Sequence, residues 1–445
     1  MKKFLLTIKK IGINGEGIGY YKKKITFVQG ALPEEEVICK VLEETDKYIK
    51  AKLLTIKKKS PFRRENIKKE FLDSGAYNLI HVEYKKQLEY KKNIVCDSFS
   101  KYLGTKYPSK IENTIACEKE FHYRNKCQFP FSIDKNGHVI AGLYKEGTNE
   151  LVNIKNCPVQ HENINKVVEI VKKYIAKYKV PISISKNFVG IKYLVCRASF
   201  ASGDVQVAFV TNSKEIPSLK KVVHELKKES FIKSIVLNIK EKNSHLVMGK
   251  ENILLYGEEN IIEKIGDVKY KLSANSFFQL NPIQTKNLYD KVIELANIKN
   301  TDIILDAFCG VGSIGIYLSK YAGEVYGVDI EEENIKNAND NIKLNNIKNC
   351  VYKLSDAKES IKKYKKDNIK FDIVIVDPPR VGLRFLANEL LKIKAKKIVY
   401  VSCNPSTLAK DMKILTKKYK IKTIIPVDMF PQTASVESIC LMIRK

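Results

Sequence analysis

One cysteine stands at a position that suits a nucleophile. Cys403 lies in Tyr-Val-Ser-Cys-Asn-Pro, residues 400–405, directly after an apolar run that predicts a strand. Pro405 is favoured in the first turn of a helix, and the partial positive charge at the start of that helix stabilises a thiolate. A free thiol is more often a buried packing residue. The helix start favours the other interpretation, in which Cys403 attacks a substrate.

A glycine-rich turn upstream suits a nucleotide-like ligand. Gly310, Gly312 and Gly315 follow a short strand-like run that ends at Asp306, and Asp329 ends the next such run. Glycines let a backbone approach its ligand closely, and an acid at the second strand's end holds ribose hydroxyls. The spacing fits a nicotinamide dinucleotide, and the turn also suits S-adenosylmethionine. A tight turn that only packs a helix on a sheet is the third interpretation.

A second turn presents a carboxylate rigidly. Asp377-Pro378-Pro379-Arg380 directly follows the apolar run 371–376. The two prolines end the strand and fix the turn, so the Asp377 side chain faces a pocket rim. Its natural partner is a planar heterocycle with N–H donors. An ordinary loop after a strand would not require an acid and an arginine around the prolines.

The general base of such a site must be a carboxylate. No histidine follows His245, so the C-terminal region has no imidazole for proton transfer. Glu437, just before the final apolar run, is the candidate, because the last strands of such a sheet return beside the nucleophile. A surface glutamate on a hairpin is the alternative, and the residues alone leave both interpretations open.

A regular alternation of elements positions these residues. Helical segments separate strand-like runs at 303–306, 324–328, 350–354, 371–376 and 397–402. This order predicts an α/β fold with a doubly wound, mostly parallel, Rossmann-like sheet over residues 271–445. Ligands bind beyond the carboxyl ends of such strands, which is where the residues named above fall.

Two further regions precede that sheet. Residues 1–58 hold short alternating runs, such as 24–29 and 36–41, between glycine and proline turns, which predict an all-β barrel. Residues 59–270 mix helical patterns at 84–95 and 165–178 with strand-like runs at 128–133 and 205–211. A mixed α+β central domain is therefore expected, and the chain is predicted to have three domains.

Charge and cysteine content limit the class of protein. The net charge of +29 indicates a polyanionic partner such as nucleic acid, although a biased genome could also produce this composition. Ten cysteines without a Cys-x-x-Cys motif argue against a disulfide framework and a zinc finger. No run approaches the length of a membrane span or a signal core, so a soluble, cytoplasmic protein is expected.

Taken together, these residues resemble the RNA uracil-C5 methyltransferase family, which includes the 23S ribosomal RNA and tRNA thymine-forming enzymes. Residues 15–19 and 27–33 resemble a TRAM domain, an oligonucleotide-binding β-barrel. Tyr-Arg-Asn-Lys at 123–126 and Ser-Phe-Phe-Gln-Leu-Asn-Pro at 276–282 are also similar to family motifs. The resemblance covers nearly the whole chain.

The resemblance implies a monomeric enzyme that methylates C5 of uridine with S-adenosylmethionine. It implies that Cys403 adds to C6 of the base and that Glu437 removes the C5 proton. The residues that would line the cofactor and base pocket are Gln279, Phe308, Asp329, Asp377, Ser313 and Asp356. The RNA would be 23S rRNA, because tRNA relatives in bacteria commonly lack a TRAM domain. Methylation of uridine 54 in tRNA is the alternative within the family.

Three other classes remain as alternatives. A nicotinamide oxidoreductase would explain the glycine turn but not the combination of Cys403 and Asp377. A non-catalytic RNA-binding protein would explain the charge and the barrel. A methyltransferase acting on an exocyclic amine would need no cysteine and would carry an aromatic residue where this chain has Arg380.

The chain departs from the family pattern at two places. Many relatives bind a 4Fe–4S cluster through four cysteines, but Ser74 and Tyr77 occupy two of those positions, and Cys157 matches a third. Four thiolates are not available, so no cluster and no metal are expected. The family usually has a histidine before the base, where this chain has Ala434 or Ser435.

Overall fold

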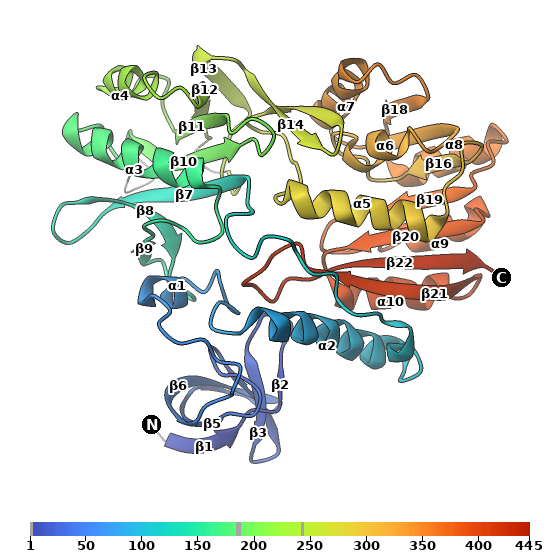
Figure 1. The fold of residues 1–445 in the computed structure, drawn as a ribbon, viewed down its shortest axis with the longest axis horizontal. Coiled ribbons are helices and arrows are strands. Elements are labelled where there is room, and N and C mark those ends of the chain that lie inside the picture. The colour runs from blue at the N-terminus through green and yellow to red at the C-terminus, as the bar shows by residue number, and fades with distance from the viewer. Residues whose placement is uncertain (1–2, 184–187, 242–243) are drawn as a thin grey trace. The chain divides into compact units, whose positions relative to one another are not determined.

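The computed structural model describes residues 3–183, 188–241 and 244–445, whose elements are labelled in Figure 1. The chain divides into two compact units. The first unit comprises residues 1–120, 378–391 and 399–445, and the second comprises residues 121–377 and 392–398. No helix among the described residues is long and apolar enough to cross a membrane.

A six-stranded sheet forms the N-terminal part of the first unit. Its strand order is β1-β5-β6-β4-β3-β2, with β1 at Lys3–Thr7, β2 at Lys10–Ile11, β3 at Gly17–Tyr21, β4 at Lys24–Val28, β5 at Glu36–Glu44 and β6 at Tyr48–Lys58. The sheet curls so that β1 also contacts β3. Residues of β1 alternate between exposed and buried, and Phe4 and Leu6 pack in a core with Val28 and Val37. The expected all-β N-terminal region is confirmed.

Two glycines of β3 are required by close backbone contacts. A Cβ atom at Gly17 would lie 2.5 Å from the carbonyl oxygen of Ala31, and one at Gly19 would lie 2.5 Å from that of Thr7. No real side chain tolerates such contacts with backbone atoms. These two positions therefore explain why the sequence alternates glycine with other residues here.

The remainder of the first unit combines helices with the last strands of the chain. These elements are α1 at Lys69–Asp73, α2 at Tyr84–Leu103, the 3-10 helix η1 at Pro108–Lys110, α10 at Pro405–Leu415, β21 at Tyr419–Val427 and β22 at Glu437–Arg444. Helix α2 starts where the sequence predicted and runs eight residues beyond the expected 95. It packs against α10, and its Lys91 forms an ion pair with Asp428 in which both side chains are fully buried.

A seven-stranded mixed sheet lies in the second unit. Its order is β13-β12-β11-β10-β7-β8-β9, with β7 at Lys126–Ile133, β8 at Val139–Tyr144, β9 at Leu151–Asn153, β10 at Ile191–Ala198, β11 at Val205–Thr211, β12 at Ile232–Ile239 and β13 at Glu251–Gly257. Helix α3 (Glu162–Lys177) packs on β8 and β10 and contacts α4 (Leu219–Leu226). Helix α3 starts before the expected residue 165 because His161 caps it, its Nδ1 accepting from the N–H of Asn163 at 3.1 Å. The mixed α+β central region is confirmed.

Parallel strands and helices alternate through the rest of the second unit and into residues 378–391 of the first unit, which hold most of α9. After the hairpin of β14 (Asn260–Ile265) and β15 (Val268–Ser273), the strands are β16 at Ile303–Asp306, β17 at Glu324–Asp329, β18 at Cys350–Leu354, β19 at Ile373–Val376 and β20 at Lys397–Ser402. The helices are α5 at Pro282–Ala296, α6 at Ser313–Leu318, α7 at Glu332–Leu344, α8 at Ala357–Lys366 and α9 at Leu386–Ile393. Strand β17 pairs in parallel with β18 and β16, and β16 pairs in parallel with β19.

Strand β20 begins in the second unit and ends in the first. At its start the N–H of Lys397 donates to the carbonyl of Asp372 at 3.1 Å, and at its end the strand order continues as β20-β22-β21. Strands β21 and β22 are antiparallel, with Val427 opposite Glu437. All five predicted strands are present, with β19 starting two residues after the expected 371 and β17 ending one residue after the expected 328, which confirms the doubly wound α/β fold.

Candidate functional site

The carboxyl ends of β16 and β19 form a topological switch point in the second unit. The chain runs outward from β16 to β17 and β18, and then returns to the other side of β16 to form β19. Ligands of open α/β sheets bind in the crevice at such a point. Asp306 is the last residue of β16 and Asp377 directly follows β19, so the structure brings two carboxyl groups to this crevice.

These two carboxyl groups are electrostatically unusual. Burial and, to a smaller extent, the neighbouring Asp377 carboxylate together raise the pKa of Asp306 to about 7. Burial also raises the pKa of Asp377. Oδ2 of Asp306 accepts from the N–H of Gly315 at 3.2 Å, whereas its Oδ1 is buried and accepts from no described residue. An unpaired buried acceptor costs about 1–3 kcal/mol, so this crevice suits a ligand with a positive charge or N–H donors.

Asp306 was not among the residues that the sequence predicted for the site. It was interpreted only as the residue before the glycine turn. An acid at the carboxyl end of the first parallel strand is itself a sign of a ligand-binding position. What the sequence did not reveal is its full burial next to a second carboxyl group.

Gln279 approaches Asp377 from the segment before α5. Its Nε2 donates to Oδ2 of Asp377 at 3.5 Å, and its backbone carbonyl accepts from the side chain of Asn125 at 3.1 Å. Asn281 caps α5 by accepting from the N–H of Gln284 at 3.2 Å, which fixes the segment that carries Gln279. The sequence predicted Gln279 and Asp377 for one pocket, and these two side chains lie together.

The glycine turn is shaped by both its backbone and its packing. Gly310 and Gly312 have φ angles of 53° and 81°, a region that favours glycine. The N–H of Gly310 donates to Oδ2 of Asp329 at 3.0 Å, so the acid at the end of β17 lies beside the turn. A Cβ atom at Gly312 would lie 2.5 Å from the ring of Tyr352. This turn therefore needs its glycines for packing as well as for any ligand.

The other three residues predicted for the cofactor occupy different environments. Phe308 is half-buried in the turn after β16. Ser313 begins α6, and its Oγ accepts from the hydroxyl of Tyr289 at 3.0 Å. Asp356 is exposed and caps α8, accepting from two backbone N–H groups at 2.8 and 3.3 Å. Phe308 thus lies in the glycine turn, and the Asp356 carboxylate caps α8.

A cavity in the first unit has Cys403 on its wall. It measures about 270 Å³ and is lined by residues 13–14, 78, 380, 403–405 and 434–436. Cys403 is half-buried and follows the last residue of β20. Asn404 caps α10, its Oδ1 accepting from the N–H of Ser406 at 3.1 Å, and Pro405 is the first residue of that helix. The thiol therefore lies at a helix start, where the sequence predicted it.

The end of the Asp-Pro-Pro-Arg turn belongs to the same cavity. Arg380 lines it, and the backbone carbonyl of Arg380 accepts from the side chains of Asn404 at 3.1 Å and Thr407 at 3.2 Å. These bonds hold the Asp-Pro-Pro-Arg segment against the first helical turn of α10. Arg380 and Cys403 are thereby fixed by one small network.

Glu437 is the first residue of β22 and is 8% exposed. Ala434, Ser435 and Val436, which directly precede it, line the cavity that holds Cys403. The structure therefore brings the segment leading to Glu437 to the wall that carries Cys403.

Asn78 ties that segment to the N-terminal barrel. Its Oδ1 accepts from the N–H of Ala434 at 2.8 Å, and its Nδ2 donates to the carbonyl of Asn14. Gly15 has a φ of 85°, and a Cβ atom there would lie 2.8 Å from Cγ of Asn78. Nothing in the type or spacing of Asn78 distinguished it in the sequence from the residues around it.

The positions that the family resemblance matches to cluster cysteines pack against neighbouring residues. Oγ of Ser74 donates to the carbonyl of Phe71 at 3.0 Å, and the ring of Tyr77 packs edge-on against Phe71. Cys157 is buried, and its N–H donates to Asn165 at 3.0 Å. Within 3–183, 188–241 and 244–445, no group of three His, Cys, Asp or Glu side chains could hold a metal ion. The expected lack of an iron–sulfur cluster stays a prediction.

Known proteins resemble this chain along its whole length. The model of the tRNA (uracil-5-)-methyltransferase family matches residues 83–445, and the TRAM domain model matches residues 2–54. A Listeria innocua protein described as an uncharacterized RNA methyltransferase is 42% identical, over 100% of this chain and 98% of its own. A Bacillus cereus protein with the same description is 38% identical, over 99% of this chain and 97% of its own.

One solved structure covers both units. It is that of the Pyrococcus abyssi tRNA (uracil-54, C5)-methyltransferase in complex with S-adenosyl-L-homocysteine, with a TM-score of 0.78 and 30% identity. The match covers 99% of this chain and 100% of that one, so it includes the N-terminal barrel.

Proposed function

The chain belongs to the tRNA (uracil-5-)-methyltransferase family, and we propose that it methylates C5 of uridine in 23S rRNA with S-adenosylmethionine as methyl donor. The observation that carries this proposal is the cavity that Cys403 shares with the segment leading to Glu437. Methylation at C5 needs a nucleophile and a base at one site, and these two residues supply them.

Cys403 provides the nucleophile. Carbon C5 of uracil is too weak a nucleophile to take a methyl group directly, but addition of a thiolate at C6 creates an enolate with electron density on C5. The start of α10 immediately after Cys403 favours the thiolate, because backbone N–H groups give the helix N-terminus a partial positive charge.

Glu437 completes the reaction as the base. S-adenosylmethionine supplies a methyl group made electrophilic by its positively charged sulfur, and C5 takes that group. Glu437 then removes the proton from C5, the electron pair of the broken C–H bond restores the C5–C6 double bond, and the C6–S bond breaks to release the Cys403 thiolate. A carboxylate fits this role because no histidine follows His245.

The switch point of the second unit fits the methyl donor. The buried Oδ1 of Asp306 accepts from no described residue, and the pKa of both Asp306 and Asp377 is raised by burial, so a cationic ligand would stabilise the charged carboxylates. Asp329 would hold the ribose hydroxyls. Asp377 and Gln279 would bind the uracil edge or the donor. Phe308, Ser313 and Asp356 complete the proposed binding set.

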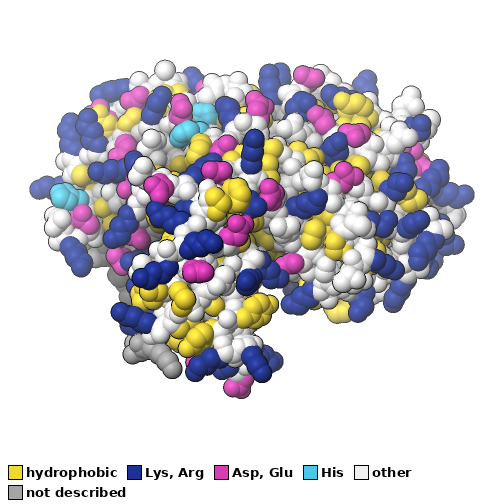
Figure 2. Space-filling model, turned by 60° about the horizontal axis from the view of Figure 1, so that its bottom comes forward, with side chains coloured by type: hydrophobic (Ala, Val, Ile, Leu, Met, Phe, Trp, Pro, Cys, Tyr) yellow, Lys and Arg dark blue, Asp and Glu magenta, His cyan; other side chains and the backbone are white. Residues whose placement is uncertain are grey.

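The substrate RNA is proposed from the barrel and the charge. Lys and Arg side chains are spread over the face that Figure 2 shows, and the net charge of +29 favours a polyanion. The target nucleotide must leave its stack to reach the half-buried thiol of Cys403. An N-terminal TRAM domain supports 23S rRNA, because tRNA relatives in bacteria commonly lack one. We further propose that the enzyme acts as a monomer in the cytoplasm, without membrane association or an iron–sulfur cluster.

Methylation of tRNA is the second candidate. The Pyrococcus abyssi enzyme is described as acting on uridine 54 of tRNA, and its match includes the barrel of this chain. Mapping 5-methyluridine in the 23S rRNA and tRNA of a deletion strain decides between the two. Loss of the modification from 23S rRNA supports the proposal, whereas loss only at uridine 54 of tRNA overturns it in favour of the alternative.

A further inference from the structure

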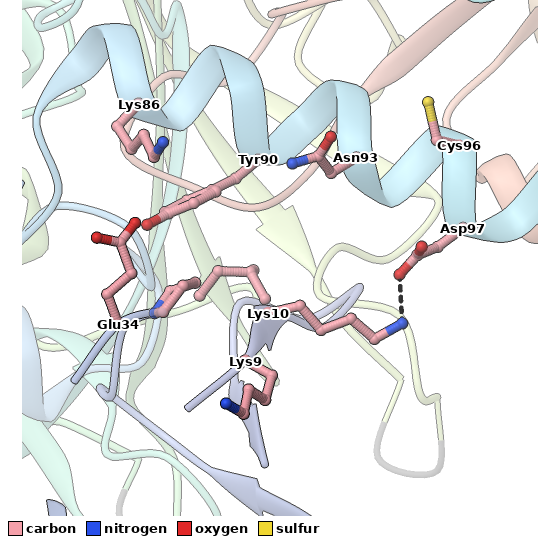
Figure 3. Close-up of a pocket in the computed structure, with 10 residues that line it drawn as sticks. Lys9, Lys10, Glu34, Lys86, Tyr90, Asn93, Cys96 and Asp97 are labelled. Carbon is pink, nitrogen blue, oxygen red and sulfur yellow. Dashed lines mark hydrogen bonds and ion pairs between the residues drawn. The ribbon is translucent and has the colours of Figure 1, made fainter. Parts of the chain in front are cut away.

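A second cavity of the first unit lies between the N-terminal barrel and α2 (Figure 3). It measures about 310 Å³. The barrel lines it with residues 9–11 and 33–34, and α2 lines it with Lys86, Tyr90, Asn93, Cys96 and Asp97. The spacing of three and four residues places these side chains on one face of the helix.

Another side of α2 contacts the segment that precedes Glu437. Lys91 pairs with Asp428, and Oε1 of Gln87 accepts from the N–H of Gln432 at 2.9 Å. One rigid helix therefore contacts the second cavity on one side and the chain leading to Glu437 on another.

Tyr90 places a hydrogen-bond donor on the cavity wall. The residue is 5% exposed, and its hydroxyl is buried without a hydrogen bond to any described residue. Burial and the nearby carboxylates of Glu34 and Glu35 raise the pKa of Tyr90, so the hydroxyl keeps its proton. In Figure 3 the ring extends from α2 toward Glu34. A polar ligand with an acceptor atom would give the Tyr90 hydroxyl a hydrogen bond that the described residues do not provide.

Charged groups line the same cavity. Glu34 has a φ of 72°, which is uncommon for a non-glycine residue, and its N–H donates to the carbonyl of Ile8 at 3.0 Å. Its carboxylate lies exposed at the cavity. Nζ of Lys10 forms an ion pair with Oδ2 of Asp97 on α2 at 2.6 Å. Lys9 adds a second ammonium group on the barrel side of the cavity. The cavity thus offers an acceptor, a hydroxyl and cations.

Residues close together in the sequence of the barrel line the two cavities. Residues 9–11 line the second cavity and residues 13–14 line the cavity of Cys403. Two residues of extended chain span at most about 7 Å, so Ile11 and Ile13 are close neighbours. An RNA strand whose target uridine enters the cavity of Cys403 therefore has nearby nucleotides within reach of the second cavity.

We propose that the second cavity binds a guanine nucleotide of the substrate RNA, close in sequence to the target uridine. This inference rests on the proposed function, because it assumes an RNA strand at Cys403. Guanine has two adjacent N–H donors on its Watson–Crick edge, which match the Glu34 carboxylate. The other three bases would place a carbonyl oxygen or a ring nitrogen, both acceptors, beside that carboxylate. Tyr90 and Asn93 remain to bind the base or ribose, and Lys9 a phosphate.

Equilibrium dialysis of the full-length protein with each of the four ribonucleoside 5′-monophosphates, at saturating S-adenosylhomocysteine, tests this assignment. We expect GMP to bind about tenfold more tightly than AMP, CMP or UMP, since hydrogen bonds to a charged group carry the difference. Glu34→Gln should remove the preference, and Tyr90→Phe should weaken GMP binding severalfold. Glu36→Gln is the matched control, because it makes the same change at an exposed position of the same barrel. Equal binding of the four nucleotides, or a preference that survives in Glu34→Gln, overturns the proposal.

Two further measurements separate this inference from the proposed function. Cys403→Ala should bind GMP as the wild type does; loss of GMP binding would mean that the nucleotide occupies the cavity of Cys403 instead. Glu34→Gln should raise the KM for a 23S rRNA transcript about tenfold without changing the KM for S-adenosylmethionine, and an unchanged RNA KM contradicts the inference. If no uridine is methylated but the GMP preference depends on Glu34, the proposed reaction fails and the nucleotide site stands.

Discussion

The side-chain oxygen of Asn78 accepts a hydrogen bond from the backbone N–H of Ala434 at 2.8 Å, three residues before Glu437. The amide nitrogen of the same side chain donates to the carbonyl of Asn14 in the turn after β2. One side chain therefore joins a turn of the N-terminal barrel to the segment that enters β22, and both line the cavity of Cys403.

Asn78→Ala is expected to lower kcat tenfold or more while leaving the KM for S-adenosylmethionine unchanged. The segment before Glu437 would lose its tether, and displacement by about 1 Å costs up to a hundredfold in rate. Asn78→Asp retains the acceptor for Ala434 and should restore part of kcat. Asn113→Ala, an exposed asparagine of the same unit, is the control. Steady-state methylation kinetics with a wild-type kcat for Asn78→Ala would exclude a positioning role.

Cys403→Ala should abolish methyl transfer and leave cofactor binding intact, because the alanine cannot add to C6. Transfer of a radiolabelled methyl group and calorimetric binding of S-adenosylhomocysteine measure the two effects. Cys39→Ala is the control, since that thiol lies in the barrel core and burial raises its pKa to about 11. Methylation retained by Cys403→Ala would refute the assignment of the nucleophile.

Glu437→Gln should trap the enzyme on its RNA. Addition by Cys403 and methyl transfer do not need the carboxylate, but release does, so a covalent protein–RNA adduct should accumulate and be visible on a denaturing gel. The double variant Cys403→Ala, Glu437→Gln should form none. If the single variant adds to C6 and turns over without an adduct, another group removes the proton.

Lys91→Met should destabilise the protein by about 3–5 kcal/mol, because it leaves the carboxylate of Asp428 buried and unpaired. Denaturant unfolding of the full chain measures the change. Replacing both partners, as in Lys91→Met with Asp428→Leu, should recover part of the loss. Lys92, the next residue on α2, donates to the side chain of exposed Asn113, so Lys92→Met should change stability little. An equal loss for Lys91→Met and Lys92→Met would contradict this account.

Stability should fall as pH rises through the range in which Asp306 titrates. Its carboxyl group has an ordinary pKa of 3.8 in the unfolded chain and about 7 in the folded protein, so the folded state favours the protonated form. The resulting contribution to the free energy of unfolding is fully present below about pH 4 and is lost by about pH 7. Each unit of pKa difference corresponds to about 1.4 kcal/mol. The Tm of the ligand-free wild type should therefore drop more steeply between pH 5 and 7 than that of Asp306→Asn. Asp46→Asn, at an exposed position, should follow the wild type, and parallel curves for all three would contradict the prediction.

The sequence by itself determined the parallel strands and the local setting of Cys403. The short strand-like runs are local patterns, and all five of them became strands. The helix start after Cys403 is equally local, because Asn404 caps α10 and Pro405 opens it. The resemblance of their motifs to the family, and not a local pattern, placed Gln279 and Asp377 in one pocket.

The tertiary structure decided which distant polar groups meet. Asn78 and Ala434 are 356 residues apart in the chain, and the contact between them follows from packing that no periodic pattern encodes. The same holds for the buried pair of Lys91 and Asp428. Burial also sets the pKa of Asp306, since desolvation depends on every element packed around the carboxyl group. Residue types and strand positions are local properties of this sequence, whereas burial and long-range pairing exist only in the folded chain.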